Sequence, residues 1–376
     1  MSLLRAPQRH PLRRALWQIH VWTGVAVAAY AALLGVTGAV LVFRPELQAR
    51  MYPAFFARWA PGDALAPPEA VIAALRARYP DDRFRGLDYP HARRGTFLIY
   101  TSHAGELRTV FADARTGRVI GELPRDGWPQ RLQELHFNLW LGDAGFGVNG
   151  AGAALLLVLC VTGLVVWWPG AARWTRALTV DARRAWRRVT WELHRATGFW
   201  TVALIAMWAL TGVYFSFPGD VRRLVGLVLP LEATAVPRSV PGASSAPRPA
   251  PADLVARARG QLPGAQVARL MLPGGDTGSY AVVLAARAHG DGDASDEVTF
   301  YFDQYSGRQL ARTEAAARPA GERVLSWLAQ LHMGTFGGFA LKAIWAALSL
   351  ALPLLGATGL VMWWNRVVRR GLREPA

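Results

Sequence analysis

Four long apolar windows alternate with polar segments along the chain. They cover residues 21–43, 149–168, 199–217 and 343–364, and none of them contains Asp, Glu, Lys or Arg. About 20 apolar residues in a helix that rises 1.5 Å per residue cross about 30 Å of hydrocarbon. Buried helices of a soluble protein are the alternative interpretation, but four such windows in one chain favour membrane spans. We therefore predict a mainly α-helical membrane protein with four transmembrane helices.

Two motifs, each with a histidine followed at a fixed distance by a Thr-Gly pair, occur twice. The spacing is 17 residues in the first motif (His20 to Thr37, and His194 to Thr211) and 26 residues in the second (His136 to Thr162, and His332 to Thr358). The pattern predicts a tandem duplication in which helix, external module and helix follow one another twice. Because both halves enter the membrane from the same side, their pseudo-two-fold axis should run along the membrane normal.

The two long segments between the windows are each patterned like a small α+β module. In the first, PPEAVIAALRARYP predicts an amphipathic helix, and FLIYTS and LRTVFAD predict two strands. The second follows the same order, with a helix in ADLVARARGQLP, strands in YAVVLAAR and VTFYFD, and a polar turn at 290–297. Two Gly-rich segments, 142–152 and 334–338, are expected either to break helices or to form the mouth of a binding cleft.

The charge distribution predicts the topology. The chain has 376 residues and a formal charge of +16, and segments 1–20, 169–198 and 365–376 together hold 15 Arg but only three acidic residues. Because cytoplasmic segments carry an excess of Arg and Lys, these three segments should be cytoplasmic and the two long segments external. The basic residues are thereby explained by topology, and we expect no nucleic-acid partner. The first window exceeds the usual length of a signal-peptide core, so we predict that it is a membrane helix.

These expectations define nine segments. They are a cytoplasmic N-terminus (1–20), a first span (21–43), a first periplasmic module (44–148), a second span (149–168), a cytoplasmic loop (169–198), a third span (199–217), a second periplasmic module (218–342), a fourth span (343–364) and a cytoplasmic C-terminus (365–376). Cys160 is the only cysteine, which excludes disulfides, zinc sites built on cysteines and iron–sulfur clusters within one chain.

Four histidines are the candidate functional residues, and their depth in the membrane groups them into two pairs. His20 and His194 stand at the cytoplasmic ends of their windows and are called the inner pair here; His136 and His332 stand on the external side and are called the outer pair. Two imidazoles that face each other in a helical bundle are a common setting for a bis-histidine heme. Zinc or copper would have only two protein ligands per pair. A histidine at the membrane surface is otherwise an ordinary interfacial residue.

Glycines on the same helical faces suggest space for a flat cofactor. At 100° per residue Gly24 lies about 40° from His20, and Gly38 returns to the angular position of His20 about 27 Å further along the helix. Gly198 and Gly212 repeat this arrangement for His194. We expect Gly24 and Gly198 to clear space at the inner pair, and Gly38 and Gly212 at the outer pair. Small residues at this spacing also simply let membrane helices pack closely.

Together, the HxxTG motifs, the two modules and the LH…TGxxxWW motifs resemble the PepSY-associated transmembrane family. Within it, the chain looks most like bacterial inner-membrane, heme-dependent ferric-siderophore reductases. The resemblance implies a multi-pass protein of the cytoplasmic membrane with two b-type hemes, whose axial ligands would be His20, His194, His136 and His332. The Trp-Trp pairs at 167–168 and 363–364 fit an aromatic belt facing membrane lipid, with the edge of the inner heme as the alternative.

Two hemes stacked across a membrane would form an electron path with a donor inside and an acceptor outside. The predicted cytoplasmic segments contain no strand–GxGxxG–helix for a nicotinamide or flavin, so the donor should be membrane quinol or a separate cytoplasmic reductase. The expected activity is an oxidoreductase that reduces ferric siderophore and releases its iron. One alternative is a peptide-binding or protease-regulating periplasmic protein that is anchored by its helices and has no redox activity. A transporter is disfavoured because the spans show neither a break nor polar residues at mid-membrane.

Overall fold

The computed structural model describes residues 11–369 except 58, 61, 92–93, 125, 232–235, 242–246 and 286–295. The outer parts of both predicted cytoplasmic termini, His10, His289 and most of the polar turn predicted at 290–297 lie outside the described residues. The chain forms two compact units. Unit 1 (residues 1–43, 128–224 and 331–376) is helical, and unit 2 (residues 44–127 and 225–330) contains the sheet.

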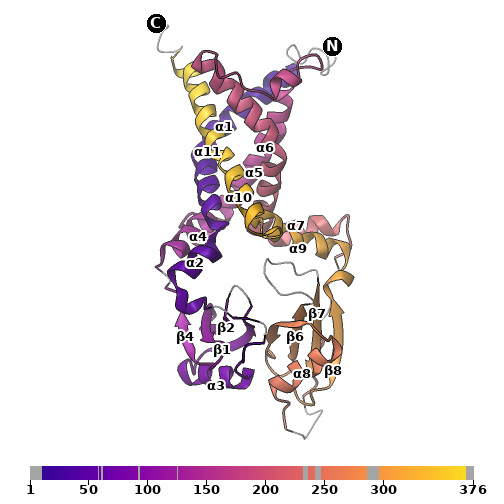
Figure 1. The fold of residues 1–376 in the computed structure, drawn as a ribbon. Helices are drawn as coiled ribbons and strands as arrows, with labels where there is room; N and C mark the ends of the chain where they lie inside the picture. Colours follow the sequence, from indigo (N-terminus) through magenta and orange to yellow (C-terminus); the bar gives the residue numbers. More distant parts are fainter. Residues whose placement is uncertain are drawn as a thin grey trace. The chain divides into compact units, whose positions relative to one another are not determined.

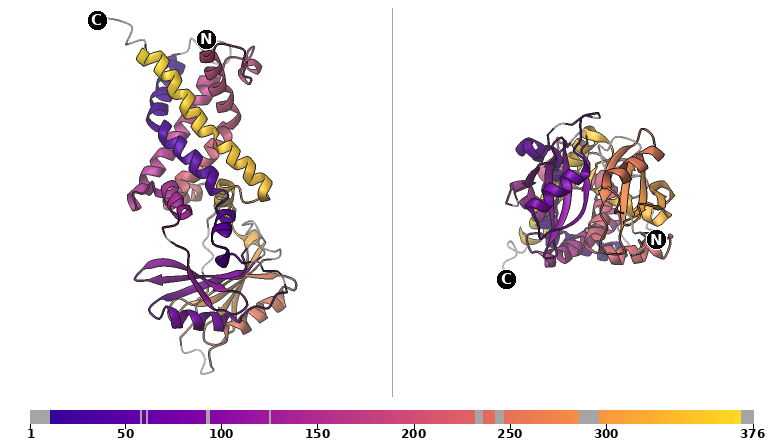
Figure 2. Two further views of the ribbon diagram at one scale, coloured as in Figure 1. Left: turned by 60° about the vertical axis from the view of Figure 1, so that its left-hand side comes forward. Right: turned by 90° about the horizontal axis from the view of Figure 1, so that it is seen from below.

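Unit 1 is a bundle of four long apolar helices (Figures 1 and 2), each long enough to cross a membrane. Helix α1 packs against α5 and α11, and α6 packs against the same two neighbours, so α1 and α6 are diagonally opposed. Small and aliphatic side chains fill the centre, among them Ala31, Leu156, Cys160 and Ala209. The bundle helices are α1 (Pro11–Leu41), α5 (Asp143–Trp167), α6 (Trp186–Ser216), α10 (Gly338–Ser349) and α11 (Ala351–Trp363), which continues as a π-helical turn, η5 (Trp364–Val368).

Helices α1 and α6 extend beyond the predicted spans at the end of the bundle where both begin, which we call the inner end. Helix α1 starts at Pro11 rather than at residue 21, and α6 starts at Trp186 rather than at residue 199. The predicted spans cover only windows without charged residues, but Arg is a good helix former, so the backbone hydrogen bonding continues through the polar segments. His20 and His194 therefore lie within their helices instead of at the helix ends.

The Gly-rich segment 142–152 is helical from Asp143 onward, so the predicted helix break is confined to the turn before it. The glycines are needed for packing, because a Cβ atom at Gly145 would collide with the Asn138 carbonyl and one at Gly152 with the Tyr30 ring. In the second half, Gly334 and Gly338 have left-handed backbone angles, with φ of 65° and 69°, in the turn that precedes α10. The two Gly-rich segments therefore differ, since the first is mostly helical and the second forms a turn. Close packing between helices decides this difference, and the number of glycines in a segment does not reveal it.

The fourth span is interrupted, which corrects the expectation of unbroken spans. Helix α10 ends at Ser349 and α11 begins at Ala351. Pro353 explains the interruption, since a proline has no N–H to donate to the carbonyl four residues earlier. That carbonyl, on Ser349, lies against Gly35 of α1, where a Cβ atom would be only 2.7 Å from the oxygen. Helix α10 also contains Lys342, the only lysine of the chain, whose side chain is 2% exposed.

Short helices complete the helical part of the fold. In unit 1, α4 precedes the second span, and the last residues of α9 precede the fourth. Helix α4 contacts both α1 and α5. The short helices are α2 (Arg44–Met51), η2 (Pro53–Phe55), α3 (Pro68–Arg78), α4 (Trp128–Asn138), η3 (Thr175–Ala177), α7 (Pro218–Gly226), α8 (Pro251–Gln261), η4 (Ala315–Ala317) and α9 (Ala320–Met333).

Unit 2 is built on one antiparallel sheet of eight strands in the order β4-β3-β2-β1-β5-β6-β7-β8 (Figures 1 and 2). The two segments that the sequence predicted as separate modules thus supply four strands each to a single sheet. The halves join where β1 pairs with β5, with Leu87 opposite Leu270. The strands are β1 (Arg83–Asp88), β2 (Thr96–His103), β3 (Glu106–Asp113), β4 (Val119–Glu122), β5 (Gln266–Met271), β6 (Ser279–Ala285), β7 (Glu297–Asp303) and β8 (Gln309–Glu314).

Helices α3 and α8 pack on the sheet and contact each other, forming one apolar core for both halves. Leu75 of α3 and Leu254 of α8 are fully buried in it beside Phe97 and Phe300 of the strands. The Glu69 side chain of α3 also accepts a hydrogen bond from the backbone N–H of Ala252 at the start of α8. The predicted helices and the strands β2, β3, β6 and β7 are therefore found, while β1, β4, β5 and β8 were not predicted.

Candidate functional site

The bundle brings the four histidines together in two pairs, one toward each end. The ring centres of His20 on α1 and His194 on α6 are 6.4 Å apart, with an angle of 83° between the ring planes. His136 on α4 and His332 on α9 have ring centres 6.3 Å apart, with an interplanar angle of 69°. These are the inner and outer pairs expected from the sequence. The outer histidines are carried by separate short helices and not by the spans themselves.

Each histidine hydrogen-bonds through Nδ1 to the threonine of a Thr-Gly pair on a neighbouring helix. The four Nδ1–Oγ1 distances are 3.1 Å (His20 and Thr162), 2.8 Å (His136 and Thr37), 2.9 Å (His194 and Thr358) and 2.6 Å (His332 and Thr211). From the sequence alone, these threonines were recognised only as repeated positions, without a predicted role. Their fourfold occurrence at fixed spacings from the histidines was the signal that could have identified them as ring partners.

The threonine hydroxyls fix which ring nitrogen carries the proton. Each hydroxyl has one hydrogen, and it donates that hydrogen to the backbone carbonyl four residues earlier, as Thr37 does to Leu33 at 2.8 Å and Thr162 to Val158 at 2.7 Å. Thr211 and Thr358 do the same, at 2.9 and 2.7 Å. The oxygen must then accept from the imidazole, so Nδ1 is protonated and Nε2 keeps a free lone pair. This is the arrangement in which a metal-binding histidine is held by a second hydrogen bond.

Three of the four Thr-Gly glycines make room for the imidazole rings themselves. A Cβ atom would lie 3.1 Å from Cε1 of His20 at Gly163, 3.2 Å from Cε1 of His136 at Gly38, and 3.4 Å from Cε1 of His194 at Gly359. Gly38 was expected to clear space for a macrocycle, and the structure places it in direct contact with an outer histidine. The close approach positions the ring from one side while the threonine fixes it at Nδ1.

The other candidate glycines have different neighbours. Gly212 lies against Ala153, whose Cβ atom is 3.2 Å from the position of an added Cβ, so the fourth Thr-Gly glycine packs helix against helix. Gly24 and Gly198 each have one leucine methyl group at 3.8 Å, an ordinary contact distance. The structure therefore puts these three glycines in helix packing and brings none of them against a histidine ring.

Side chains of the bundle hold the ends of the short helices that carry the outer pair. The Asn149 amide donates to the carbonyl of His136 at 2.8 Å, and the Tyr30 hydroxyl orients this amide through a 2.7 Å bond to its oxygen. In the second half, the Trp208 indole donates to the carbonyl of His332 at 3.1 Å and Trp345 donates to the preceding carbonyl at 2.8 Å. No sequence pattern indicates these contacts, because they depend on how separate helices pack together.

Burial keeps the outer histidines neutral. It lowers the pKa of His136 to about 4 and the pKa of His332 to about 3. A neutral imidazole is the form that binds a metal ion, since the protonated ring has no free lone pair. The protonation state and the tautomer therefore both leave Nε2 available as a ligand.

The spacing of the ring centres fits a single metal ion between the two imidazoles. An imidazole nitrogen binds a metal at about 2.0–2.1 Å and a ring centre lies about 1.1 Å behind its nitrogen, so two such rings on opposite sides of one ion are about 6.3 Å apart. Among the described residues, no group of three or more His, Cys, Asp and Glu could hold a metal ion. Each pair thus offers two nitrogen ligands, which suits a metal whose remaining ligands come from a cofactor, as in heme.

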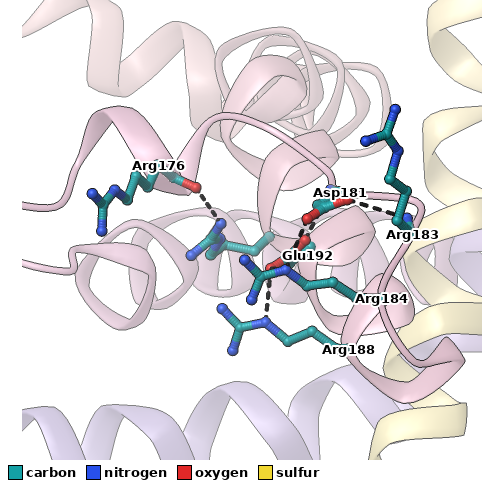
Figure 3. Close-up of polar contacts among 7 residues, drawn as sticks. Arg176, Asp181, Arg183, Arg184, Arg188 and Glu192 are labelled. Carbon is teal, nitrogen blue, oxygen red and sulfur yellow. Dashed lines mark hydrogen bonds and ion pairs between the residues drawn. The ribbon is translucent and has the colours of Figure 1, made fainter.

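The inner end of the bundle carries a cluster of arginines around two acidic residues (Figure 3). Glu192 accepts hydrogen bonds from Arg188 at 2.7 Å and from the backbone N–H of Asp181 at 3.0 Å. Asp181 in turn accepts from Arg184 at 3.1 Å and from the backbone of Arg183, and this bonding lowers the pKa of the Asp181 carboxyl group. The cluster ties the loop before α6 to that helix.

The remaining described histidines lie in unit 2, away from the pairs in sequence and without a repeated partner. His103 approaches Asp82 at 3.0 Å, and His91 forms an isolated β-bridge with Arg94. Neither residue belongs to a group of three or more potential metal ligands among the described residues.

The comparisons with known proteins give one result. A sequence model of the protein family described as the PepSY-associated TM region matches residues 17–366, which include both histidine pairs and all four Thr-Gly pairs. No curated protein matches the chain.

Proposed function

The chain belongs to the PepSY-associated transmembrane family, and from this premise we propose that it is a di-heme membrane oxidoreductase that reduces ferric siderophore on the periplasmic side of the bacterial inner membrane. One heme would be held by His20 and His194, and the other by His136 and His332. The observation that carries the proposal is the repeated geometry of the two pairs, with ring centres 6.4 and 6.3 Å apart and with Nδ1 of every ring bonded to a threonine hydroxyl.

Different residues of the chain would have different roles at such a heme site. A bound heme supplies one-electron redox chemistry, while the protein sets its ligands, surroundings and position. The threonines hold the imidazoles by Nδ1, and the glycines at 38, 163 and 359 hold the rings at close contact. On helix α1, His20 belongs to the inner pair and Thr37 bonds to His136 of the outer pair. The 17 residues between them correspond to about 26 Å of helical rise, which is most of the thickness of the hydrocarbon layer.

The direction of electron flow rests on the charge distribution. The arginine-rich segments beside the inner pair favour a cytoplasmic position, so the electron donor, quinol or a separate reductase, would reach the inner pair. The ferric siderophore would then accept electrons near the outer pair. Ferric iron prefers hard oxygen ligands more strongly than ferrous iron does, so reduction weakens the siderophore complex and releases the metal.

The first test is the heme content of the purified protein. We expect two hemes per chain with a reversible reduced-minus-oxidised spectrum, and about one heme per chain when one histidine of either pair is replaced, as in His20→Leu or His136→Leu. His103→Leu, in unit 2, is the matched control and should leave the spectrum unchanged. A colourless protein, or a spectrum indifferent to all four substitutions, would refute the proposal and favour the alternative of a membrane-anchored, peptide-binding or protease-regulating protein.

The second test concerns the substrate and the orientation. Ferric siderophore added to the dithionite-reduced protein should reoxidise the heme, with ferrous iron trapped by a coloured chelator, whereas the iron-free siderophore should have no effect. Reporter fusions after residue 127 and after residue 369 should report periplasmic and cytoplasmic positions respectively. Heme reoxidation that is equally fast without ferric siderophore, or reporters with the opposite pattern, would contradict this part of the proposal.

A further inference from the structure

Several buried N–H groups at the inner end of the bundle have no hydrogen-bond acceptor. The indole N–H groups of Trp167, Trp168 and Trp363 are enclosed by the protein without a partner, and so is Nε of Arg13. A buried donor without a partner destabilises the fold, and native structures nearly always supply an acceptor. A cluster of such donors in one place points to an acceptor that is not part of the polypeptide.

Two of these indoles occupy equivalent positions in the repeated motifs. Trp167 and Trp363 are 196 residues apart, the same interval that separates His136 from His332. Each follows a Thr-Gly glycine by four residues, so it lies one helical turn further inward on the same face of α5 or α11. Those glycines, Gly163 and Gly359, contact the two inner histidines. The unpartnered donors therefore flank the inner pair from both sides.

Arg13 approaches the same place from a third helix. It precedes His20 by seven residues, two helical turns on the same face of α1, and its Nη2 donates to the carbonyl of Val166 at 2.6 Å. This bond leaves Nε without a partner next to the residue that precedes Trp167. A positive charge and indole N–H groups are thus combined at one depth of the bundle.

No acidic side chain of the described protein is free to serve these donors. Within the described residues of unit 1, Asp181 and Glu192 are the only acidic residues at the inner end. Both are already bonded to the arginines of the loop and of the first turns of α6 (Figure 3). The acceptor that suits the remaining donors is an anionic oxygen brought by a ligand.

We propose that Trp167 and Trp363, assisted by Arg13, bind the two carboxylate groups of the inner tetrapyrrole, so that its carboxylate edge faces the inner surface. This inference rests on the proposed function. A protoporphyrin carries two propionates on one edge, and the axis that relates them lies in the plane of the ring. A ring held between α1 and α6, with that axis along the bundle, would present one carboxylate toward α5 and the other toward α11, the helices that carry the two indoles.

Lipid phosphate is the other source of anionic oxygens at this depth. It would not match the two-fold placement of the indoles one turn from the ligand-contacting glycines. Phosphate groups would also be drawn to the exposed arginines of the loop, whereas the unpartnered indole nitrogens are enclosed by protein. The two sources make different predictions, because only a tetrapyrrole can have its carboxylates blocked chemically without changing the membrane.

The experiment compares protoheme with its dimethyl ester in the heme-depleted full-length protein. Binding of each is titrated for the unchanged protein, for Trp167→Phe, for Trp363→Phe and for the double variant. Trp200→Phe is the matched control, since its indole also lies toward the inner end of α6 but is exposed and donates to the Leu178 carbonyl. The inner site is isolated by repeating the titrations with His136→Leu, which removes an outer ligand.

The expected result is a preference for protoheme over the ester that falls by about tenfold for each indole removed, since a hydrogen bond to a charged group contributes at least about 1.4 kcal/mol. Trp200→Phe should keep the full preference. The frequencies of the propionate-bending modes in resonance Raman spectra should also shift in the single variants, which provides a readout if the double variant folds poorly.

Three outcomes are decisive. Equal preference in the unchanged protein and the double variant, with unshifted propionate modes, overturns the inference while leaving the heme proposal intact. Loss of bound anionic lipid in native mass spectra of the variants, without a change in the protoheme preference, overturns it in favour of lipid phosphate. No binding of either tetrapyrrole to any form of the protein means that the proposed function itself has failed.

Discussion

The inner and outer histidine pairs have nearly the same ring geometry but are built differently. The inner histidines belong to the continuous helices α1 and α6, whose own backbone hydrogen bonds fix their positions. The outer histidines lie on α4 and α9, short helices joined to the spans by turns. In the first of these turns, Leu139 and Trp140 have positive φ angles of 55° and 60°, a conformation that costs energy in residues other than glycine.

The difference shows where the structure needs extra contacts. Both pairs use the same threonine bond, but only the outer pair has its helix ends tied to the bundle, by Asn149 in one half and by Trp208 and Trp345 in the other. A ligand inside a long helix needs no such support. We therefore expect the outer site to be the more sensitive to contacts outside the histidine–threonine pairs.

The largest expected effect comes from filling the close contact beside a histidine. Gly38→Leu should abolish heme binding at the outer pair and leave the inner heme, and Gly163→Leu should do the reverse, because the Cβ atom alone would lie 3.2 or 3.1 Å from Cε1 of the ring. Overpacking of this kind costs about 1–3 kcal/mol even without displacing a ligand. Heme quantification and reduced-minus-oxidised spectra measure the loss.

The control for the glycine variants is Gly147→Leu on α5, where an added Cβ atom has no described atom within 4 Å. Gly24→Ala provides a second control, because its nearest neighbour is an ordinary 3.8 Å contact. If Gly38→Leu keeps both hemes with unchanged spectra, the glycine does not position the ring and the contact has no functional meaning.

A smaller effect is expected from removing the acceptor for Nδ1. Thr162→Val at the inner pair and Thr37→Val at the outer pair keep the side-chain shape but leave the imidazole N–H unbonded. Loss of such a supporting hydrogen bond typically lowers metal affinity by about 10- to 100-fold. Heme transfer to an excess of apomyoglobin measures the affinity of each site.

Thr201→Val is the matched control for the threonine variants. Thr201 is buried in α6 and its hydroxyl bonds only to the Thr197 carbonyl of its own helix, so it has the same chemistry without a histidine partner. Equal heme loss rates in Thr201→Val, Thr162→Val and Thr37→Val would mean that the hydroxyls stabilise helices and do not orient the ligands.

The smallest expected effect comes from removing the contacts that hold the ends of α4 and α9. It should also differ most clearly between the two histidine pairs. Asn149→Leu removes the bonds that hold the end of α4, and Trp345→Phe removes one that holds the end of α9. A hydrogen bond contributes about 1 kcal/mol, so each variant should weaken the outer heme about fivefold without changing the inner one. Weakening of both hemes to the same extent would show that these contacts support the whole bundle and not the outer site.

Much of unit 1 could be predicted from the sequence because its information is local. The apolar windows predicted the four membrane helices, which the structure and the family match support. The positions of the histidines at the ends of the apolar windows placed His20 and His194 at one depth and His136 and His332 at another, and the structure brings together these two pairs. Local periodicity does not show which residues of other helices pack against each face of a helix. Gly38 was therefore expected to clear space for a cofactor, and no function was predicted for the threonines.

Unit 2 was predicted less completely because strand pairing is a long-range property. Strands β2, β3, β6 and β7 have clear apolar patterns, but β1, with the sequence RFRGLD, is short and highly charged. It becomes a strand because β2 and β5 pair with it on either side, and β5 comes from the other half of the chain. The sequence pattern alone therefore indicated two modules where the structure has one sheet.

The sequence by itself determined the number of spans, their repeated histidine and threonine positions, and the depth of each pair, since hydrophobicity and helical rise act along a single segment. Only the tertiary structure decided that each imidazole bonds to a threonine of a neighbouring helix and that the rings of each pair lie close together. It also decided that the fourth span is interrupted at Leu350 and that the tryptophans at 167 and 363 bury unpartnered N–H groups. These features depend on which atoms meet across helices, and this is set by packing.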